Sequence, residues 1–507
     1  MRTRNCFPVP LATLSLAITV VFMGLAASSG GQTPASPAND ALARGFQDPP
    51  DPARPRVWWH WMNGNVTREG ITLDLEWMKR VGVGGIQNFD ANIGNILARE
   101  WTTAQYVDDR IVYHSPEWKE LLRHTAAECD RLGLEMTMHA SGGWSETGGP
   151  WVKPEEAMKK LVWSETRVEG PRKLSGTLAA PPSVNGPFQD VPYRHFFMPP
   201  SEPEDGPPPT HYGDSAVIAY RLSAGEVEMA DASPTVTRSG GDFDTAALYD
   251  GNLAQAVSLP LPEGDESAWI QYEFAEPYAA RAFTMAVQLG LGGAWPTGTL
   301  QASEDGTTFE TLVALPGPSG RGIPARTFAF PKTTARFYRV VLAAAPRSPM
   351  AAFFGMPAPV QVDLAEAALV PEARVNRWEE KAGFGLLLEY DSVPTPAMPS
   401  DALIPRDHVV DLTSRMSPDG RLEWDVPEGQ WVILRMGYSL TGQKNNPAPP
   451  EATGYEVDKL NPAHVETYLR GYLDPIAEAM EPSSARASST SCSTAGRRGC
   501  RTGPRRC

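Results

Sequence analysis

The chain has 507 residues, with 49 prolines, 45 glycines and a formal net charge of −15. A chain of this length allows several domains. The charge falls to −23 once Arg2, Arg4 and the six arginines after Ser483 are set aside, and so acidic a body excludes nucleic acids and anionic membranes as expected partners.

The N-terminus predicts an export signal. Arg2 and Arg4 precede an apolar run from Leu11 to Ala27 that ends in small residues. The run is short for a membrane-spanning helix, and a Gly/Ser/Pro-rich segment follows it. We therefore expect removal of residues 1–30, a flexible linker over 31–48, and an exported protein of the periplasm or the extracellular space with no membrane partner after cleavage.

The placement of the cysteines argues against a disulfide framework and a thiolate metal site. Cys6 lies in the predicted signal, and Cys492, Cys500 and Cys507 lie in an unusual C-terminal tail. Only Cys129 remains, on the apolar face of a predicted helix, where packing is its expected role.

Residues 57–84 predict a strand followed by a helix. Val57–Met62 is an aromatic, β-favouring run that stops at the turn signal Asn63-Gly64-Asn65. Thr67 can cap a helix that Gly82 ends. The apolar positions of this helix share one face: Ile71, Leu75 and Met78.

Residues 85–140 predict a second strand, a second helix and a third strand. Gly85–Asp90 is the second strand, and Ser115-Pro116-Glu117 is a strong helix start. The helix ends at Gly133, before a strand over Leu134–Ala140. Its apolar positions follow helical spacing: Trp118, Leu121, Leu122, Thr125, Cys129 and Leu132. Strands that alternate with helices imply a parallel sheet with right-handed crossovers.

Two folds fit this alternation, a (β/α)8 barrel and a doubly wound sheet. A dinucleotide-binding sheet needs a glycine fingerprint directly after a strand, whereas Gly82–Gly85 follows a helix. A barrel carries its chemistry at the C-terminal ends of its strands. Polar residues stand at those ends here: Asn63, Asn65, Asp90, Asn92, His139 and the loop 141–146. The sequence therefore favours a barrel enzyme.

Several of these segments also carry a family resemblance. They are Trp61-x-Asn63-Gly64-Asn65-Val66-Thr67, Gly84-Gly85-Ile86, Gly142-Gly143-Trp144-Ser145-x-x-Gly148-Gly149-Pro150-Trp151 and Gly454–Leu460. Together they resemble glycoside hydrolase family 106, the α-L-rhamnosidases, from residue 49 to about residue 480. The resemblance implies a catalytic barrel interrupted by β-sandwich insertions, inverting hydrolysis of terminal rhamnosides of plant or microbial glycans, and a calcium ion at the site. It implies no nucleotide or redox cofactor.

The composition changes after residue 166. Residues 154–165 predict one more barrel helix, and 167–232 form a Pro/Gly-rich connection. Short β runs broken by turns then predict a β-sandwich over 233–345: Ala268–Phe274, Ala282–Val287 and Arg336–Leu342. Leu248–Asn252 and Ser303–Phe309 resemble recurring pieces of a galactose-binding-like (discoidin type) jelly roll. Such an insert can bind sugar or act as a spacer, and we favour the spacer.

The pattern of the barrel returns near the C-terminus. Residues 346–440 predict a mixed β connection, with Asp419-Gly420 as a hairpin turn and Trp431–Arg435 as a strand. Asn461-Pro462 then starts a helix, so the barrel resumes over 441–482. The predicted fold class is α/β plus β: the N-terminal half of a (β/α)8 barrel, interrupted by a jelly-roll insertion, with its first part over 49–166.

Hydrolysis of a glycoside usually needs two carboxylates that flank the bond. Candidate substrate-binding residues at strand ends and adjoining loops are Asn63, Asn65, Asp90, His139, Trp144, Glu146, Glu456 and Asp458. Each carboxylate could instead be a solvated loop residue or a cap. His60 could bond a sugar hydroxyl or be a satisfied core histidine, and Trp58, Trp59 and Trp61 are expected to pack the barrel. The ligands of the implied calcium ion cannot be named.

These features predict an exported glycoside hydrolase of the α-L-rhamnosidase type, acting on an oligosaccharide or polysaccharide. The alternatives are a family 2-like β-galactosidase or β-glucuronidase, and a non-catalytic secreted carbohydrate-binding protein. The resemblance places its Asp-Ser-Trp-Glu-Ala-Gly motif, with a catalytic glutamate, beyond Tyr472–Pro475. Because that motif and a second catalytic carboxylate are absent from the written sequence, we expect a truncated, inactive enzyme.

Residues 483–507 contain no aliphatic side chain larger than alanine and predict no core strand or helix. We expect this tail to be read out of frame, because codons for Ser493–Pro504 exist that, shifted by two bases, read Asp-Ser-Trp-Glu-Ala-Gly-Leu-Gln-Asn-Trp-Thr. Resequencing of the locus should find those codons and an open frame beyond the break. A coding sequence that forbids them would refute the shift.

Overall fold

The computed structural model describes residues 41–92, 105–192, 209–222, 226–262, 267–288, 295–317, 323–343, 358–385, 387, 389–480 and 491–492. The predicted signal and most of the tail lie outside these ranges. The chain divides into two compact units, Met1–Pro55 and Arg56–Cys507. In the first unit, helix α1 (Ala41–Gln47) occupies part of the predicted flexible linker.

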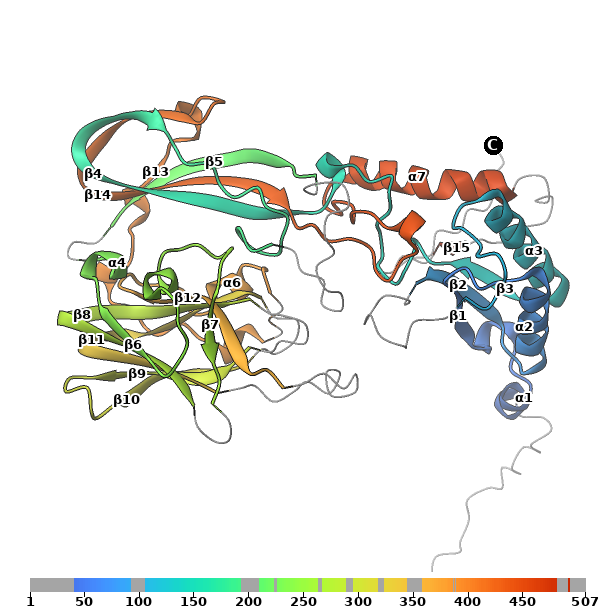
Figure 1. The fold of residues 1–507 in the computed structure, drawn as a ribbon. Coiled ribbons are helices and arrows are strands. Elements are labelled where there is room, and N and C mark those ends of the chain that lie inside the picture. The colour runs from blue at the N-terminus through green and yellow to red at the C-terminus, as the bar shows by residue number, and fades with distance from the viewer. Residues whose placement is uncertain are drawn as a thin grey trace, which may run out of the picture. The chain divides into compact units, whose positions relative to one another are not determined.

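Three parallel strands begin the second unit, as predicted (Figure 1). β1 (Arg56–Met62) pairs with β2 (Gly85–Ala91), and β2 pairs with β3 (Glu135–Met138). Helix α2 (Arg68–Arg80) joins the first pair, and α3 (Pro116–Leu132) joins the second. The predicted strand–helix alternation and its parallel sheet are therefore confirmed.

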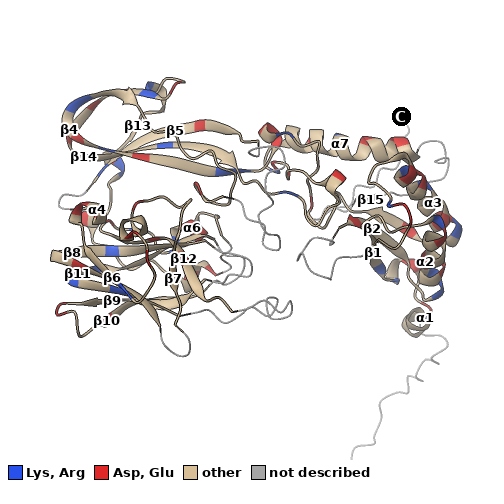
Figure 2. Cartoon of the chain, in the orientation of Figure 1, with Lys and Arg blue, Asp and Glu red and all other residues tan. Residues whose placement is uncertain are grey.

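Both helices begin at the predicted caps. The Oγ1 atom of Thr67 accepts the Gly70 N–H at 3.0 Å, and the Oγ atom of Ser115 accepts the Trp118 N–H at 3.1 Å. Charged residues of both signs lie along α2 and α3 (Figure 2). The opposite, apolar faces are buried, as predicted: Ile71, Leu75, Met78, Leu121, Leu122 and Cys129.

One prediction about the tail is wrong. Ser491–Cys492 forms a short strand, β15, which pairs in parallel with Thr137 and Met138 of β3. Strand pairing uses backbone N–H and C=O groups, so it does not require the large aliphatic side chains that the tail lacks. The described part of this sheet therefore has the order β1-β2-β3-β15.

The barrel helix predicted over 154–165 is also absent from the described structure. Pro154–Glu156 forms a single 3-10 turn, and strand β4 (Lys159–Thr177) follows almost at once. Lys160 and Val162 are buried while Leu161 between them is exposed, which is the period-two pattern of a strand. Charged residues among the apolar ones make this stretch resemble an amphipathic helix.

A third sheet forms mostly from the two segments predicted as connections, and the strand predicted at Trp431–Arg435 lies within it. β4 joins β5 (Tyr212–Arg221), β13 (Val409–Asp411) and β14 (Arg421–Leu440) in the antiparallel order β13-β5-β14-β4. The predicted turn at Asp419-Gly420 precedes β14, and Gly420 has a φ of +82°. The sheet has its own core: Val168, Val217, Leu412, Leu422, Trp424, Trp431 and Ile433.

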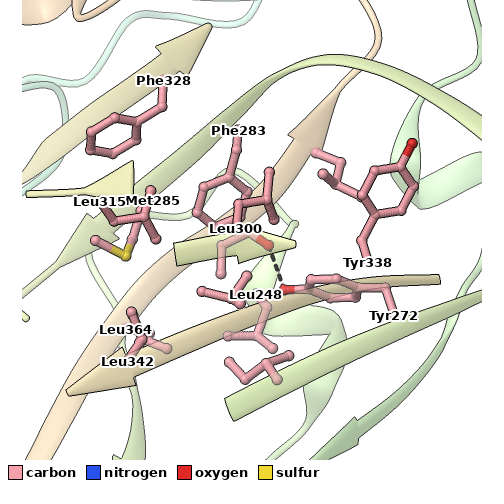
Figure 3. Close-up of a cluster of buried hydrophobic side chains, with 14 of the residues drawn as sticks. Leu248, Tyr272, Phe283, Met285, Leu300, Leu315, Phe328, Tyr338, Leu342 and Leu364 are labelled. Atoms are coloured by element: carbon pink, nitrogen blue, oxygen red, sulfur yellow. Dashed lines mark hydrogen bonds between the residues drawn. The ribbon is translucent and has the colours of Figure 1, made fainter. Parts of the chain in front are cut away.

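The insert is a β-sandwich, as predicted. Its strands are β6 (Thr235–Arg238), β7 (Val257–Pro260), β8 (Ala268–Val287), β9 (Thr297–Ser303), β10 (Glu310–Leu315), β11 (Ala325–Ala343) and β12 (Gln361–Val370). Their order is β10-β9-β11-β8-β12-β7, with β6 also on β8. Register shifts in β11 let one hydrogen-bonded sheet bend around the core shown in Figure 3. Because β12 belongs to this sheet, the sandwich extends past the predicted boundary at residue 345.

Residues 441–480 pack into the hydrophobic core that the parallel sheet shares with α2 and α3. Helix α7 (Pro462–Met480) and the segment before it bury Tyr455, Val457, Tyr468, Tyr472 and Ile476 in the same cluster as Trp61 and Ile86. Their described part adds this helix but no further strand to the parallel sheet. No helix in the described ranges is long and apolar enough to cross a membrane.

A buried ionic cluster attaches helix α6 (Trp378–Lys381) to β11. Arg326 and Glu380 are each 1% exposed and lie 3.0 Å apart, and Glu380 also pairs with Arg377. The neighbouring Glu379 carboxylate accepts the backbone N–H of Thr327 at 3.0 Å. Because all these groups are shielded from water, each charge depends on its partner.

We expect Glu380→Ala to destabilise the insert by about 3–5 kcal/mol, since it leaves Arg326 and Arg377 as uncompensated buried charges. Urea unfolding of the purified chain measures this loss. Glu423→Ala is the matched control: it removes an exposed pair with Arg421 at 3.7 Å and should cost less than about 1 kcal/mol. Equal losses in the two variants would contradict the role of the buried cluster.

Candidate functional site

The loops that follow the three parallel strands meet at one edge of the sheet. The Asn63 N–H donates to the Ala91 carbonyl at 2.8 Å, which joins the first two strand ends. The Gly143 N–H donates to the Asp90 carbonyl at 2.7 Å, which joins the second end to the glycine-rich loop after β3. The predicted gathering of strand ends is therefore present.

Three rings from neighbouring strands stack in a row on one face of the sheet, and we call His60, Phe89 and His139 the ring row. The His60 and Phe89 centroids are 5.0 Å apart, and those of Phe89 and His139 are 4.4 Å apart. Residues side by side in a parallel sheet point to the same face, so the register of β1 and β2 creates this row. Trp58 flanks it, 5.1 Å from Phe89, and is 67% exposed.

Trp144 stands at the edge of the ring row. Its indole is 49% exposed, and its Nε1–H donates to Nε2 of His60 at 2.9 Å. An indole can only donate, so His60 Nε2 must accept and the imidazole carries its proton on Nδ1. Burial also lowers the pKa of His60. His60 is therefore a neutral ring that holds Trp144 in place.

His139 is fixed in a comparable way. Its Nε2 lies 2.7 Å from the Ser145 carbonyl, which can only accept, so that nitrogen carries a proton. Burial lowers the pKa of His139, and the negative charge of Glu146 partly opposes this effect. At neutral pH the ring row is thus uncharged, with Glu146 exposed beside it.

The glycine-rich loop is anchored by a segment that lies about 300 residues later. The Asn445 side chain is 2% exposed; its Nδ2 donates to the Gly142 carbonyl at 3.0 Å and to the Ala452 carbonyl at 2.8 Å. Its Oδ1 accepts the Gly454 N–H at 2.9 Å. One amide thus joins three backbone groups. Asn445 was missed from the sequence, where the adjacent Asn445-Asn446-Pro447 was its only signal.

Gly143 lets this anchor approach closely. Its φ is +79°, and a Cβ atom there would lie 2.8 Å from the Asn446 carbonyl carbon and 2.9 Å from that of Pro447. The neighbouring Trp144 N–H donates to the Asn446 carbonyl at 3.1 Å. The glycine therefore sets the path that presents Trp144.

The two predicted asparagines organise the loop after β1. Asn63 is buried, 9% exposed, with a φ of +54°. The Oδ1 atom of Asn65 accepts the Tyr106 N–H at 2.7 Å and the Gln105 Nε2–H at 3.1 Å. The two bonds accepted by Asn65 hold residues 105 and 106 against this loop.

Asp90 faces away from the ring row. It follows Phe89 in β2, so its side chain points to the opposite face of the sheet, where Oδ1 accepts the Trp118 indole N–H at 3.0 Å. Burial raises the pKa of Asp90 to about 7, and the bond from Trp118 opposes that rise. It is a buried carboxyl behind the strand ends.

Glu456 and Asp458 brace the segment after β14. Glu456 pairs with Lys459 and accepts from Thr147 Oγ1 at 3.4 Å, which ties it to the end of the glycine-rich loop. Asp458 pairs with Lys159 at 3.3 Å and accepts the Leu460 N–H at 3.1 Å. Of the predicted residues, His139 is therefore part of the ring row, and Trp144 and Glu146 lie beside it.

An exposed indole beside neutral imidazoles suits a ligand with an apolar face and uncharged hydroxyl groups. The rings supply flat apolar area, and the imidazoles supply hydrogen-bonding nitrogens with no net charge. A sugar ring has both features, so carbohydrate binding is the chemistry that this arrangement favours.

Comparison with known proteins gives a consistent picture. The family Glyco_hydro_106, described as alpha-L-rhamnosidase, matches residues 47–492. A solved rhamnosidase from Novosphingobium sp. PP1Y is 39% identical with a TM-score of 0.71, over 88% of this chain and 38% of that one. A protein of Formosa agariphila, named provisionally as a beta-glucuronidase, is 25% identical over 86% of this chain and 22% of its own length. The chain thus spans well under half of either relative.

Asp90→Asn is expected to make stability less sensitive to pH. A folded-state pKa of about 7, against an ordinary value of 3.8, means that the folded state resists ionisation. The free energy of unfolding of the wild type therefore falls by up to about 4 kcal/mol as the pH rises from about 4 through 7. This figure takes about 1.36 kcal/mol for each pH unit between the unfolded and folded pKa values. The variant keeps an oxygen for Trp118 and avoids this loss.

Urea unfolding at several pH values measures the effect. The two proteins should be similarly stable at pH 4, and the variant should be the more stable at pH 8. Asp74→Asn is the matched control, because Asp74 accepts the Trp59 indole N–H at 3.0 Å at an exposed position. Parallel pH profiles for wild type and Asp90→Asn would disprove the buried-acid interpretation.

Proposed function

The chain belongs to the α-L-rhamnosidases of glycoside hydrolase family 106, and on this premise we propose that the ring row and Trp144 form the sugar-binding wall of a rhamnosidase. Its substrates are terminal rhamnosides of plant or microbial glycans. The observation that carries the proposal is the half-exposed Trp144 indole, fixed by its bond to His60.

The wall suits a deoxy sugar in particular. The methyl group of rhamnose adds apolar area, which the Trp144 and Trp58 rings can cover. Its hydroxyl groups can accept from the Nδ1–H of His60 without any charge being buried. Burial keeps both imidazoles neutral at physiological pH, so binding does not depend on an ionic contact.

Within the proposal, β1, β2 and β3 are the first strands of a (β/α)8 barrel whose inner face carries the ring row. The parallel pairing and the polar strand ends support this assignment. The return of residues 441–480 to the same core supports a barrel chain that the sandwich and the third sheet interrupt.

Inverting hydrolysis needs a general acid and a general base on opposite sides of the glycosidic bond. Asp90 is turned toward Trp118, and Glu456 and Asp458 are each paired with a lysine. Only Glu146 among the four carboxylate candidates stands exposed beside the wall. We therefore infer that the mature chain, residues 31–507, binds rhamnosides without turning them over.

Calcium enters the proposal by resemblance alone. Within the described residues, no three His, Cys, Asp or Glu side chains are close enough to share one metal ion. Three of the four carboxylate candidates, Asp90, Glu456 and Asp458, also have the separate partners given above. These residues do not fit a metal centre of that kind, so no step of binding is assigned to calcium. We also propose that the protein is exported and that residues 1–30 are removed. This part rests on the sequence pattern of the N-terminus.

Binding of methyl α-L-rhamnoside to the purified chain, measured by calorimetry, tests this function. Trp144→Ala should weaken binding by about tenfold, because it removes one aromatic stacking contact. His60→Ala should also weaken binding, because it removes a ring of the wall and its Nδ1–H donor and frees the Trp144 indole. Trp77→Ala is the matched control, because Trp77 is 54% exposed on α2, which packs on the opposite face of the sheet.

A substrate panel separates the alternatives. Hydrolysis of an aryl rhamnoside by this chain would overturn the absence of turnover. Preference for a β-glucuronide would instead favour the activity in the name of the Formosa relative. Binding that Trp144→Ala does not weaken would show that the sugar site lies elsewhere, for example in the insert.

A further inference from the structure

Two tyrosines of α7 hold the backbone at the point where β3 ends. Tyr468 and Tyr472 lie one helical turn apart, are each 2% exposed, and stack with an interplanar angle of 2°. The Tyr468 hydroxyl donates to the Ala140 carbonyl at 2.5 Å, and the Tyr472 hydroxyl donates to the His139 carbonyl. The helix thus bonds two consecutive carbonyl groups.

These bonds replace a strand ladder at its end. Within the described residues, β15 pairs with β3 at Thr137 and Met138. The next two carbonyls, of His139 and Ala140, lie beyond that register, and a buried carbonyl without a donor is costly. The tyrosine hydroxyls supply the donors, so α7 determines where the β3 backbone stops being a strand and becomes the glycine-rich loop.

The Tyr472 hydroxyl is itself held on its other side. Tyr113, which is buried, forms a hydrogen bond with Tyr472. Because Tyr472 donates its proton to the His139 carbonyl, its oxygen accepts from Tyr113. The Tyr472 ring also lies 6.2 Å from that of Trp151 and 6.4 Å from that of His114. Little freedom remains for this side chain.

His139, whose carbonyl Tyr472 bonds, presents its imidazole to the sugar-binding wall. Its imidazole stacks on Phe89 and donates to Ser145, while its carbonyl is held from behind by Tyr472. A displacement of the backbone at residue 139 would therefore move a ring of the binding wall and the carbonyl that precedes the loop of Trp144. Small errors in such geometry are costly for recognition.

We propose that Tyr472 is a positioning residue for the sugar-binding wall: its hydroxyl sets the backbone of His139 and so the place of that imidazole, with Tyr468 acting likewise on Ala140. The inference rests on the proposed function and deepens it. It assigns a role in sugar binding to a helix that contributes no side chain to the wall.

The test compares three variants of the full chain, each of which removes one hydroxyl: Tyr472→Phe, Tyr468→Phe and Tyr272→Phe. Tyr272 is the matched control, because its buried hydroxyl donates to the Ala367 carbonyl at 2.5 Å inside the sandwich (Figure 3). The measurements are the melting temperature, the affinity for methyl α-L-rhamnoside and the NMR titration of His139. The chain has only eight histidines, so loss of a signal in His139→Gln assigns it.

Tyr472→Phe should shift the His139 resonance and its titration midpoint, and should weaken binding by about three- to tenfold, the equivalent of one hydrogen bond. Tyr272→Phe should lower the melting temperature without changing either quantity. An unchanged His139 resonance and affinity in Tyr472→Phe, with only a lower melting temperature, would overturn the proposal. If Tyr472→Phe does not fold, Tyr468→Phe decides in the same way.

Different outcomes refute the proposed function and the positioning role of Tyr472. If the wild type binds no rhamnoside, the proposed function fails while the NMR titration still decides whether Tyr472 positions His139. If the wild type binds and the resonance of His139 moves without a change in affinity, the positioning role in binding is refuted and the proposed function stands.

Discussion

The parallel register of β1, β2 and β3 is the constraint on which the candidate site depends. It places the His60 ring beside the Phe89 ring, and the His139 ring, one residue past the end of β3, stacks next to Phe89. A slip of one residue in either pair would turn the rings toward the helices and the acid Asp90 toward the ring row. The same register therefore separates a neutral, aromatic face from a buried polar one.

That separation explains why the two faces behave differently toward charge. The ring row keeps its imidazoles neutral by burial and by directed hydrogen bonds, which suits an uncharged ligand. On the helix side, Asp90 is held among aromatic groups by one indole, with its pKa raised to about 7. Tyr113 and Tyr472 connect that side to the carbonyl of His139, so the support of the wall comes from behind the sheet.

Local patterns predicted much of the first half of the fold. Caps such as Thr67 and Ser115, glycine stops and period-two runs are decided by neighbouring residues, and the structure confirms them. The third sheet could not be predicted, because the paired residues of β4 and β14 are 244 (Thr177 to Arg421) to 281 (Lys159 to Leu440) positions apart in sequence. The helix predicted over 154–165 was wrong because charged residues on a strand mimic the pattern of a helix. β15 was missed because backbone pairing leaves no trace in side-chain composition.

For the candidate site too, local features could be predicted from the sequence and long-range features could not. Strand ends and the glycine-rich loop could be located from sequence, so Trp144 and His139 were found. Which way a strand-end carboxylate points depends on the register, and Asp90 accordingly lies on the far face. Asn445 acts by bonding backbone groups, one of them in a loop 303 residues away, and the short Asn445-Asn446-Pro447 run does not reveal that long-range contact.

The bond between Asn445 and Gly142 spans 303 residues, and this has a consequence for the order of events during synthesis. At about 5–20 residues per second, the glycine-rich loop leaves the ribosome roughly 15–60 s before its anchor. The sandwich can close in that interval, because all its strands have already emerged. The early strands must wait without α7, exposing apolar surface and an unpaired edge to chaperones and to neighbouring chains. The sugar-binding wall is thus among the last features to form, and its binding ability reports that folding is complete.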